Sequence, residues 1–482
     1  MVSSPTLRNL KFLYQLVANL FIVMAIVSLI TAIFIRALQF GPGELLSWFH
    51  AFHPSHIFLA ALLPAAAITS YNMAKRSRAI YLVDYACFKP SSNFRVSLAL
   101  YKEHLHLMPY LDDRTVKFME RMLDRSGLGD ETSVPPAYTY IPPSRSFSEA
   151  RDEAKLVIFS VLDDLFSKTF IDPAAIEILI VNCSLFAPTP SYSDMIINRY
   201  KLRSDINNMH LSGMGCSASM ISVGLAKNLL QTKPHGTYAL VVSTETISDL
   251  GMYKGKKRSM HLPNILFRIG GAAVLISNSR HKARFQLNHL QRTITTTESA
   301  YHSVILEEDE HGNLGINLSK DLIAISADAF KTSLSAIAPY TLPTSEMLRF
   351  LLSYILRKMF NDRMKPYMPN FCLAVEHFCI HPGGPAVIDA VQSSLRLSDV
   401  HVEPSRMTLH RFGNTSSSSL WYELAYIEAK GRMQKGNRVL MIAFGSGYKC
   451  NIAVWQCLQP PYSSDASWAN CIHQYPVEAR KV

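Results

Sequence analysis

A single cysteine stands between a glycine-rich turn and an apolar helix. Residues 207–219 read Asn-Asn-Met-His-Leu-Ser-Gly-Met-Gly-Cys-Ser-Ala-Ser, and residues 220–230 predict the helix. A thiol at a helix N-terminus meets the partial positive charge of the helix dipole and exposed backbone N–H groups, and both favour the thiolate. Cys216 is therefore a candidate nucleophile. The alternative is a small buried hydrophobic residue, which is the common state of a free cysteine.

Two further polar residues that could take part in catalysis stand next to turns in the second half of the chain. His381 stands before a Pro-Gly-Gly turn, and Asn414 follows Gly413 and precedes a predicted helix that ends near Lys430. Together with a cysteine, they supply a nucleophile, a base or hydrogen-bond donor, and an oxyanion stabiliser. Papain-like proteases share the chain order Cys, His, Asn. The Cys-Gly-Ser-Cys-Trp context of those enzymes is absent around Cys216, which disfavours that class.

Alternating strands and helices are predicted around these residues. Short β-branched runs predict buried strands, and apolar residues at helical spacing predict helices. The predicted strands cover residues 176–181, 238–243, 271–277, 371–375 and 439–444, and further predicted helices cover 148–166 and 385–395. Residues 80–150, which contain two Pro-Pro pairs, are interpreted as a connector. Strands that alternate with helices in this way indicate an α/β fold.

The two halves of the chain share a spacing. Cys216 and the predicted strand near Ala239 are 23 residues apart, and Asn414 and the strand near Arg438 are 24 residues apart. Both the cysteine and the asparagine stand at a turn that leads into a helix. The match predicts an internal duplication of a strand–helix–strand unit, in which two helix N-termini point toward one central cleft.

The N-terminal region carries two hydrophobic runs. Residues 13–35 contain no charge and are long enough to span a bilayer, and residues 57–71 form a shorter run interrupted by Pro64. Basic residues flank the outer ends of both runs, so the positive-inside rule predicts a helical hairpin with both flanks in the cytosol and the loop in the lumen. A cleaved signal peptide is the competing interpretation, and the second run argues against it.

Composition narrows the remaining function classes. The chain has 482 residues and a net charge of +11, which suits an anionic membrane face or phosphate-bearing substrates. Zinc-finger spacing and aromatic-interleaved basic patches are absent from the sequence, so we expect no metal site and no nucleic-acid partner. The stretch 213–215 lacks the third glycine of a dinucleotide loop, so NAD is not expected. The basic run 254–258 is interpreted as a solvated face.

The other cysteines and the glycosylation sequons predict no chemistry. The eight cysteines form no CxxC pair, which indicates a reducing compartment. Cys183, Cys379 and Cys450 stand in apolar contexts and are expected in the core. The two N-glycosylation sequons begin at Asn182 and Asn414, in the part of the chain expected to face the cytosol. We interpret them as chance matches.

Several longer motifs resemble one known family. They are Val-Asn-Cys-Ser-Leu-Phe at 181–186 with Pro-Thr-Pro-Ser at 188–191, Gly-Met-Gly-Cys-Ser-Ala at 213–218, Val-Ser-Thr-Glu at 242–245, Leu-Ser-Lys-Asp-Leu at 318–322, His-Phe-Cys-Ile-His at 377–381, and 410–419. These motifs are similar to those of the membrane-bound 3-ketoacyl-CoA synthases of plants, the condensing enzymes of fatty-acid elongation. The resemblance runs from about residue 80 to the C-terminus.

The resemblance implies a fold and its division. The expected fold is an α/β, thiolase-like, five-layered αβαβα arrangement of two similar halves, preceded by the N-terminal transmembrane helical hairpin. The expected domains are the membrane anchor at 1–79, the half with the nucleophilic cysteine at 80–345, and the half with the histidine and asparagine at 346–482.

The resemblance also implies an activity and roles for residues. The activity is that of a very-long-chain 3-ketoacyl-CoA synthase, which condenses acyl-CoA with malonyl-CoA and releases CO₂. Cys216 takes the acyl group as a thioester, and His381 and Asn414 hydrogen-bond the malonyl thioester oxygen and stabilise the enolate. The backbone N–H groups of Cys216 and Ser446, next to Gly445, are candidates for a second oxyanion hole. Two more histidines, His377 and His410, match the family. They either orient the site or form hydrogen bonds with polar groups in the core.

Partners and location follow from the same resemblance. We expect CoA thioesters as substrates with no permanently bound cofactor, membrane lipid as a contact, a homodimer, and the reductases and dehydratase of an elongase complex as partners. The expected location is the endoplasmic reticulum membrane, with the catalytic domain facing the cytosol.

Two alternatives stay open. One is a polyketide-type condensing enzyme with aromatic starters, and the other is a non-catalytic homologue that modulates elongase partners. Departures from the family pattern motivate the second. Ile294 replaces a histidine that usually follows Arg-Thr, Ser212 and Ser219 replace glycines, and Pro382 and Pro385 flank the two glycines after His381. Serine lacks the backbone freedom of glycine, and the prolines stiffen the loop.

Overall fold

The structure is a computed structural model that describes residues 78–359, 367–461 and 463–478. The two hydrophobic runs that predict the membrane hairpin lie outside the described residues. Within the described part, no helix combines the length and the apolar character that crossing a bilayer requires. The segment from Arg78 to the C-terminus forms one compact unit.

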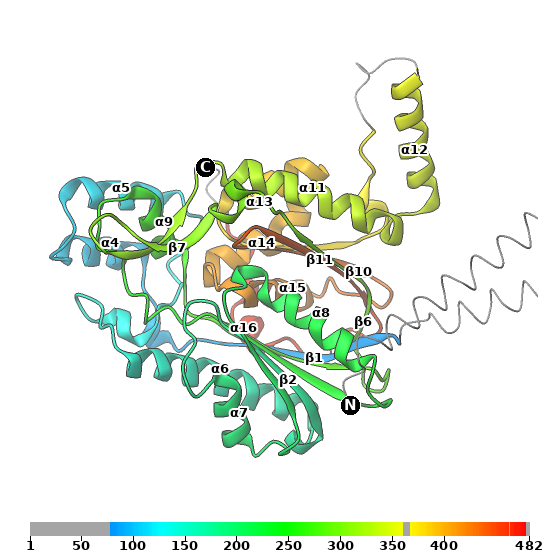
Figure 1. Cartoon of the computed structure of the whole chain (residues 1–482), viewed down its shortest axis with the longest axis horizontal. Coiled ribbons are helices and arrows are strands. Elements are labelled where there is room, and N and C mark those ends of the chain that lie inside the picture. Colours follow the sequence, from blue (N-terminus) through cyan, green and yellow to red (C-terminus); the bar gives the residue numbers. More distant parts are fainter. Residues whose placement is uncertain (1–77, 360–366, 462, 479–482) are drawn as a thin grey trace, which may run out of the picture. The chain divides into compact units, whose positions relative to one another are not determined.

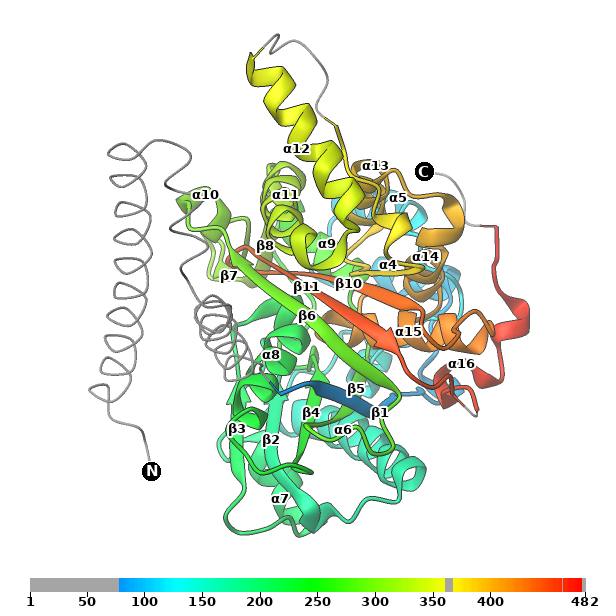
Figure 2. The same cartoon turned by 90° about the vertical axis from the view of Figure 1, so that its right-hand side faces the viewer.

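A nine-stranded mixed sheet organises this unit, with strands in the order β3-β2-β4-β5-β1-β6-β11-β10-β9 (Figures 1 and 2). The strands are β1 (Ile80–Cys87), β2 (Ile176–Asn182), β3 (Asn207–Leu211), β4 (Tyr238–Thr244), β5 (Gly271–Ser277), β6 (Phe285–Ile294), β9 (His377–Ile380), β10 (Arg438–Gly445) and β11 (Lys449–Cys457). A separate two-stranded sheet pairs β7 (Val304–Glu308) with β8 (Leu314–Leu318).

Helices pack on the faces of the sheet and between its two halves. Those of the described residues are α4 (Leu98–Leu107), α5 (Asp113–Asp124), α6 (Phe147–Thr169), α7 (Tyr192–Tyr200), α8 (Ala218–Leu230), α9 (Arg258–Leu266), α10 (Glu298–Tyr301), α11 (Leu322–Thr341), α12 (Thr344–Met359), α13 (Pro385–Leu395), α14 (Asp399–Phe412), α15 (Ser419–Ala429) and α16 (Ala466–Ala469). Figure 1 shows α6 and α7 below the sheet, α8 and α15 in the middle, and α11 and α13 above.

The expected duplication is present in the strand pairing. β2 runs parallel to β4, which pairs antiparallel with β5, and β9 runs parallel to β10, which pairs antiparallel with β11. Each unit has a helix, α8 or α15, that begins directly after a short 3₁₀ turn at Gly215–Ser217 or Ser416–Ser418. β1 and β6 pair antiparallel and join the two units into one sheet. The boundary at 345/346 stays a prediction.

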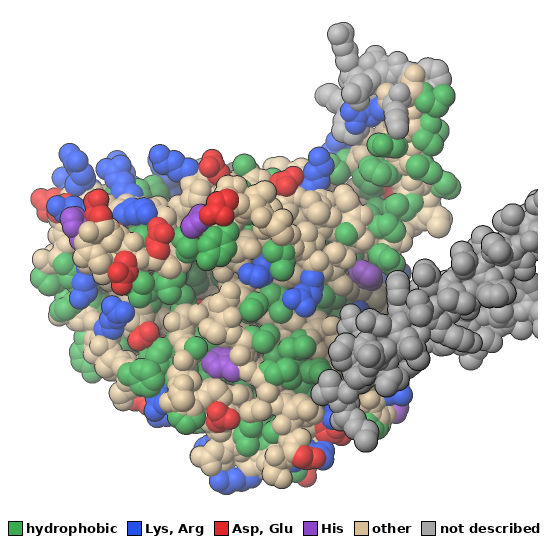
Figure 3. All heavy atoms as spheres, viewed as in Figure 1, with side chains coloured by type: hydrophobic (Ala, Val, Ile, Leu, Met, Phe, Trp, Pro, Cys, Tyr) green, Lys and Arg blue, Asp and Glu red, His purple; other side chains and the backbone are tan. Residues whose placement is uncertain are grey.

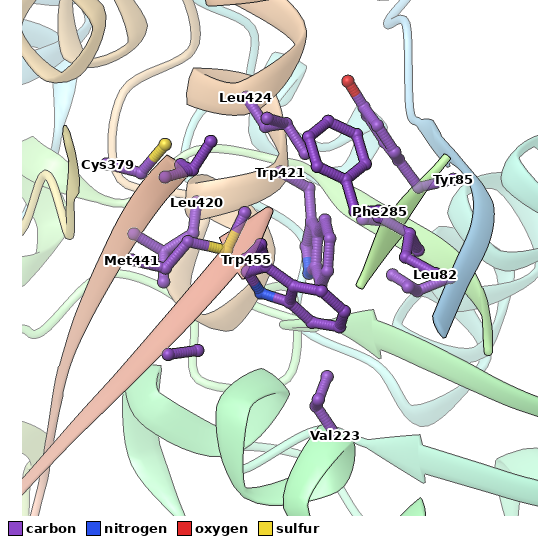
Figure 4. Packing of buried hydrophobic residues seen from close by; sticks show 14 of the residues in the cluster. Leu82, Tyr85, Val223, Phe285, Cys379, Leu420, Trp421, Leu424, Met441 and Trp455 are labelled. Atoms are coloured by element: carbon purple, nitrogen blue, oxygen red, sulfur yellow. The ribbon is translucent and has the colours of Figure 1, made fainter. Parts of the chain in front are cut away.

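Helix α15 of the middle layer is buried on all sides. Ten consecutive residues of α15, Ser419 to Glu428, are buried. A helix that is hydrophobic all round belongs in a core, where it contacts both sheet ends. The ring centroids of Trp421 and Trp455 lie 6.3 Å apart, and Tyr85 approaches Trp421 from β1 at 5.7 Å (Figure 4). This packing fixes the start of the helix and therefore the turn that carries Asn414.

Most predicted elements are confirmed, and two predictions are wrong. Residues 80–150 are not a connector, because Ile80–Cys87 form β1 at the centre of the sheet and α4 and α5 follow. Residues 371–375 are not a strand either. Phe371–Leu373 form a 3₁₀ turn capped by Asn370, and β9 begins at His377, where the backbone meets Val439 of β10. Both strands are set by pairing with distant residues, which local composition does not report.

Candidate active site

One cavity of about 560 Å³ collects the residues predicted to do chemistry. Its lining includes Cys216 from the first half of the chain and His381 and Asn414 from the second, together with Gly445 and Ser446. The volume falls in the range of small-molecule sites, roughly 300–1,000 Å³. Residues more than 160 positions apart therefore face one space, as the duplicated fold requires.

Cys216 lies in the 3₁₀ turn directly before α8. Burial raises the pKa of its thiol to about 12, against the opposing effect of a hydrogen bond with Ser416. Burial thus acts against the effect expected from the helix dipole, because desolvation disfavours the charged thiolate. The resting nucleophile is a thiol, and its proton must leave as the sulfur attacks.

His381 continues β9, and its N–H donates to the Ile442 carbonyl at 2.9 Å. The ring is buried, and burial lowers its pKa to about 4, so the imidazole is neutral at physiological pH. Nδ1 is buried without a hydrogen-bond partner, whereas the Nε2 edge faces Gly383, which also lines the cavity. Nε2 is therefore the nitrogen that meets a ligand, and a neutral ring can donate its proton there.

Asn414 is fixed by contacts with both halves. Its backbone N–H donates to the Leu266 carbonyl at 2.9 Å, and its carbonyl accepts from the Arg268 N–H at 3.0 Å. Its side-chain Oδ1 accepts from the Ser416 N–H at 2.8 Å. Since the Ser416 N–H needs an acceptor, the Asn414 oxygen must point toward Ser416, which fixes the orientation of the amide. Nδ2 is then left to donate into the cavity.

Two glycines let the turn of Cys216 approach the turn of Ser446. A Cβ on Gly215, which has φ +68°, would lie 2.5 Å from the Ser446 backbone nitrogen. A Cβ on Gly445 would lie 2.4 Å from the Ser217 hydroxyl oxygen. Side chains at either position would separate the two turns. The close approach is what the predicted oxyanion pair of the Cys216 and Ser446 N–H groups needs.

Glu245 is a site residue to which the sequence analysis gave no role. It follows β4, is buried, and lines the cavity. Its Oε1 accepts from the N–H groups of Ser184 and Leu185 at 2.8 and 2.7 Å, and its Oε2 accepts from the Ser416 hydroxyl at 2.8 Å. Burial raises the pKa of Glu245. The only signal in the sequence was its place at the end of the motif 242–245.

Ser416 connects this carboxylate to the nucleophile. It has φ +57°, a left-handed conformation that non-glycine residues rarely adopt, and it is buried. Its hydroxyl lies between Glu245 and the Cys216 sulfur, and its N–H holds Asn414. One strained serine therefore links the nucleophile, the carboxylate and the amide donor, as strained residues at functional sites commonly do.

His377 and His410 do not line the cavity. His377 stands at the start of β9 with Nε2 at 3.2 Å from the Asn437 Oδ1. His410 lies near the end of α14, where its ring meets that of Tyr475 edge to face at 5.9 Å. The structure thus places both beside the elements that present His381 and Asn414, at positions where their contacts are with protein.

The wall of the cavity is mostly apolar. It is supplied by the α9 end, the β7–β8 sheet and neighbouring segments, and its large apolar members are Leu185, Pro263, Leu266, Phe267, Tyr301, Val304, Ile305, Leu306, Ile316, Leu318, Leu322, Val387 and Phe444. Lys449 adds one cation, and burial lowers the pKa of its amine. An apolar wall with few polar groups at one place suits a ligand with a long hydrocarbon part and one reactive end.

Three of the departures from the family pattern, Ile294, Ser219 and Pro385, do not line the cavity. Ile294 is exposed at the end of β6 and does not line the cavity. Ser219 is helical, and its hydroxyl accepts the Trp421 indole N–H at 2.8 Å, so the position needs no glycine freedom. Pro385 is the first residue of α13, a position that proline favours.

The residues predicted to be inert are in the core. Cys183, Cys379 and Cys450 are at most 1% exposed, as predicted. Asn182 is fully buried, and its amide donates to the hydroxyls of Ser222 and Ser243. A glycan on Asn182 would have no space, which agrees with a chance sequon. The basic run is on the surface, where Lys257 pairs with Glu307 at 3.0 Å.

Comparison with known proteins gives the family. A family model described as FAE1/Type III polyketide synthase-like protein matches residues 72–359, and one described as 3-oxoacyl-(acyl-carrier-protein) synthase III C terminal matches residues 374–457. The chain is 51% identical to 3-ketoacyl-CoA synthase 5 of Arabidopsis thaliana, over 98% of this chain and 97% of that protein. The chain is 50% identical to 3-ketoacyl-CoA synthase 6 of Arabidopsis thaliana, over 98% of this chain and 96% of that protein.

The chain belongs to the 3-ketoacyl-CoA synthase family. Members of this family are condensing acyltransferases. Among solved structures, the C-terminal type III polyketide synthase domain of Steely1 from Dictyostelium aligns with this synthase at a TM-score of 0.62 and 16% identity, over 79% of this chain and 100% of that domain. At this identity the likeness shows the fold, which is thiolase-like.

Proposed function

We propose that this synthase condenses a long acyl-CoA with malonyl-CoA and releases a 3-ketoacyl-CoA that is two carbons longer, CO₂ and CoA. The observation that carries the proposal is the convergence of Cys216, His381 and Asn414 on one cavity whose wall is largely apolar. A thiol provides the acyl acceptor, two neutral donors provide an enolate site, and the apolar wall accommodates the chain. We propose no permanently bound cofactor, since CoA thioesters supply every reacting carbon.

The first half-reaction transfers the acyl group to the enzyme. The Cys216 sulfur attacks the thioester carbon, the bond from that carbon to the CoA sulfur breaks, and the CoA thiolate takes the proton that the thiol releases. The oxyanion of the tetrahedral intermediate accepts hydrogen bonds from the N–H groups of Cys216 and Ser446. A pKa near 12 for the free thiol makes this proton transfer part of the attack and not a preceding step.

The second half-reaction forms the carbon–carbon bond. The bond between the carboxylate carbon and the α-carbon of malonyl-CoA breaks, CO₂ leaves, and the electron pair forms an enolate. Its oxygen accepts hydrogen bonds from Nε2 of His381 and Nδ2 of Asn414, which are strong in a site that excludes water. The α-carbon then attacks the acyl thioester, the bond to the Cys216 sulfur breaks, and the thiolate takes a proton from solvent, which replaces the proton that left with CoA.

Membrane attachment completes the proposal. We propose that residues 1–79 anchor the enzyme in the endoplasmic reticulum membrane with the described unit in the cytosol, on the strength of the two hydrophobic runs and their basic flanks. Long acyl chains partition into the bilayer, so an anchored enzyme meets its substrate there. A homodimer and the reductases and dehydratase of elongation are the proposed partners.

The test separates the two half-reactions in the full-length enzyme. Microsomes that contain the wild-type chain should incorporate labelled malonyl carbon into 3-keto products, and Cys216→Ala should lose both product and labelled acyl-enzyme. His381→Ala and Asn414→Asp, which replaces the Nδ2 donor by an acceptor, should still form the acyl-enzyme. Both should release CO₂ from malonyl-CoA about 10²–10³-fold more slowly, the usual effect of removing one oxyanion donor.

The outcomes distinguish the alternatives. Unchanged turnover in Cys216→Ala would contradict the mechanism. A wild-type protein that never forms an acyl-cysteine supports the non-catalytic homologue, and acceptance of aromatic but not long aliphatic acyl-CoA supports the polyketide-type enzyme.

A further inference from the structure

Helix α12 projects from the body and exposes an apolar stripe. Five of its exposed apolar side chains stand at spacings of three and four residues, which places them on one face of the helix, and Phe350 and Tyr354 are exposed beside that face. The stripe consists of Leu348, Leu351, Leu352, Ile355 and Met359, which are 41–69% exposed. Figure 1 shows α12 standing off the sheet, and Figure 3 shows hydrophobic side chains along its free side. Exposed patches of this kind mark a binding surface.

The base of α12 lies close to the point where the chain leaves the predicted membrane anchor. Ile80, the first residue of β1, pairs with Leu287 of β6. Two residues further along β6, the ring of His289 stacks on Tyr340 at 4.1 Å between centroids. Tyr340 lies in the last turn of α11 and is separated from α12 by three residues. One strand pairing, two residues of β6 and one ring stack therefore connect Ile80 to the end of α11 that precedes α12.

The link to the anchor is short. The second predicted hydrophobic run ends at residue 71, so nine residues lead to Ile80 and span at most about 30 Å when fully extended. Figures 1 and 2 show the first part of β1 and α12 on the same side of the unit. A bilayer that holds the anchor is therefore within reach of α12.

The charges of α12 fit an anionic lipid surface. The helix carries three basic residues, Arg349, Arg357 and Lys358, against a single acidic one, Glu346. Glu346 is buried and pairs with Arg349, whose Nη1 lies 3.2 Å from Oε1, and it also accepts from the Tyr367 hydroxyl at 2.7 Å and the Asn370 N–H at 2.8 Å. The net charge of the helix sequence is +2. An exposed apolar stripe on a helix of net positive charge is the pattern of an interfacial helix. Pairing with α12 of a second copy is less favourable than an anionic lipid surface, because it would bring two positively charged helices together.

We propose that α12 lies on the cytosolic surface of the bilayer, with its stripe at the acyl-chain boundary, as a second membrane contact besides the anchor. The inference rests on the membrane attachment proposed above. At about 1.5 Å per residue, α12 is about 24 Å long, which suits a helix in the plane of the surface. The contact orients the catalytic unit with respect to the lipid from which the acyl chain comes.

The test places a tryptophan reporter on the stripe of the full-length chain. Leu352→Trp and, as matched control, Leu107→Trp are reconstituted into phosphatidylcholine–phosphatidylserine liposomes with or without bromine on the acyl chains, which quenches nearby tryptophan. Leu107 is 61% exposed on α4, at the opposite end of Figure 1. We expect the fluorescence that Leu352→Trp adds to fall at least twofold with bromolipid, and that of Leu107→Trp to stay unchanged.

Flotation of the same liposomes keeps the two proposals apart. Protein that does not float contradicts membrane attachment itself. Protein that floats while Leu352→Trp is not quenched contradicts the docking of α12 and leaves the anchor intact. Disulfide formation between copies through Leu352→Cys in the same liposomes, with no quenching, would show that a second copy covers the stripe and would also overturn the proposal. In a Leu351→Glu/Ile355→Glu background, the quenching of Leu352→Trp should disappear while circular dichroism is retained.

Discussion

At the scale of the residue, protonation states assign the roles around the cavity. Burial raises the pKa of Cys216 to about 12 and lowers that of His381 to about 4. The empty site at neutral pH therefore holds a thiol and a neutral imidazole. A neutral imidazole is a poor base for that thiol but a good donor to a developing enolate oxygen, which supports the proposed division between acyl transfer at sulfur and decarboxylation at the two donors.

Glu245 should hold the thiol proton in place. Its charge is one of the causes that raise the pKa of Cys216. Glu245→Gln removes the charge and keeps an amide of the same shape, so the pKa of the thiol should fall by about 1 pH unit. In the full-length enzyme, the midpoint of the pH profile for Cys216 alkylation by iodoacetamide should move to lower pH by that amount.

A remote carboxylate provides the comparison. Glu103→Gln alters an exposed carboxylate on α4 and should leave the alkylation profile unchanged. An unshifted profile in Glu245→Gln, or an equal shift in Glu103→Gln, would show that Glu245 exerts no specific effect on the sulfur.

At the scale of the element, the turns position the polar residues and the small β7–β8 sheet forms part of the cavity wall. The 3₁₀ turns before α8 and α15 place Cys216 and Asn414, and the β7–β8 sheet contributes apolar wall. Successive side chains on a strand point to opposite faces. On β8, Ile316 and Leu318 line the cavity, while the Asn317 amide donates to the Glu307 carboxylate at 2.8 Å.

Ile316 should limit the length of the acyl chain. It is buried in the cavity wall, and Ile316→Trp adds volume there. We expect the product distribution to shift toward chains shorter by at least two carbons, with the acylation of Cys216 by short substrates preserved. Gas chromatography of acyl chains after expression in a host with known acyl-CoA pools measures the shift.

The neighbouring residue on the same strand is the control. Asn317→Ala changes the opposite face of β8 and should keep the wild-type distribution. If Ile316→Trp also keeps that distribution, the chain occupies another part of the cavity.

At the scale of the whole molecule, a charge cluster built around the buried Glu428 joins the two duplicated units. The guanidinium of Arg284, at the start of β6, pairs with Asp84 of β1 and Glu428 of α15. The Tyr85 hydroxyl donates to the same Glu428 at 2.5 Å. Since β1 and β6 are the strands through which the two units meet, this cluster lies at their junction.

Removing the cation should destabilise the junction. Arg284→Ala leaves Asp84 and Glu428 without their partner, and an uncompensated buried charge costs about 3–5 kcal/mol of unfolding free energy. The midpoint of thermal unfolding of the full-length enzyme in detergent should fall clearly. Arg203→Ala, which breaks an exposed ion pair with Asp205, should have little effect. Equal midpoints for the two variants would contradict the role of the cluster.

Local sequence alone determined the elements and the candidate residues. The strands at 176–181, 238–243 and 271–277 and the helix at 385–395 follow from β-branched runs and helical spacing, and they are present. Cys216, His381 and Asn414 were found because turn residues and helix starts are visible locally. Family motifs then gave them roles, which remain for experiment to test.

Tertiary structure decided what depends on distant partners. β1 is a strand because β5 and β6 pair with it, and β9 begins at His377 because β10 sets its register. The pKa of Cys216 rises because the surrounding protein excludes water from the sulfur. Glu245 and Ser416 joined the site only when the fold brought residues 171 positions apart into one hydrogen bond. Pairing, desolvation and such contacts are properties of the folded chain, and no local pattern encodes them.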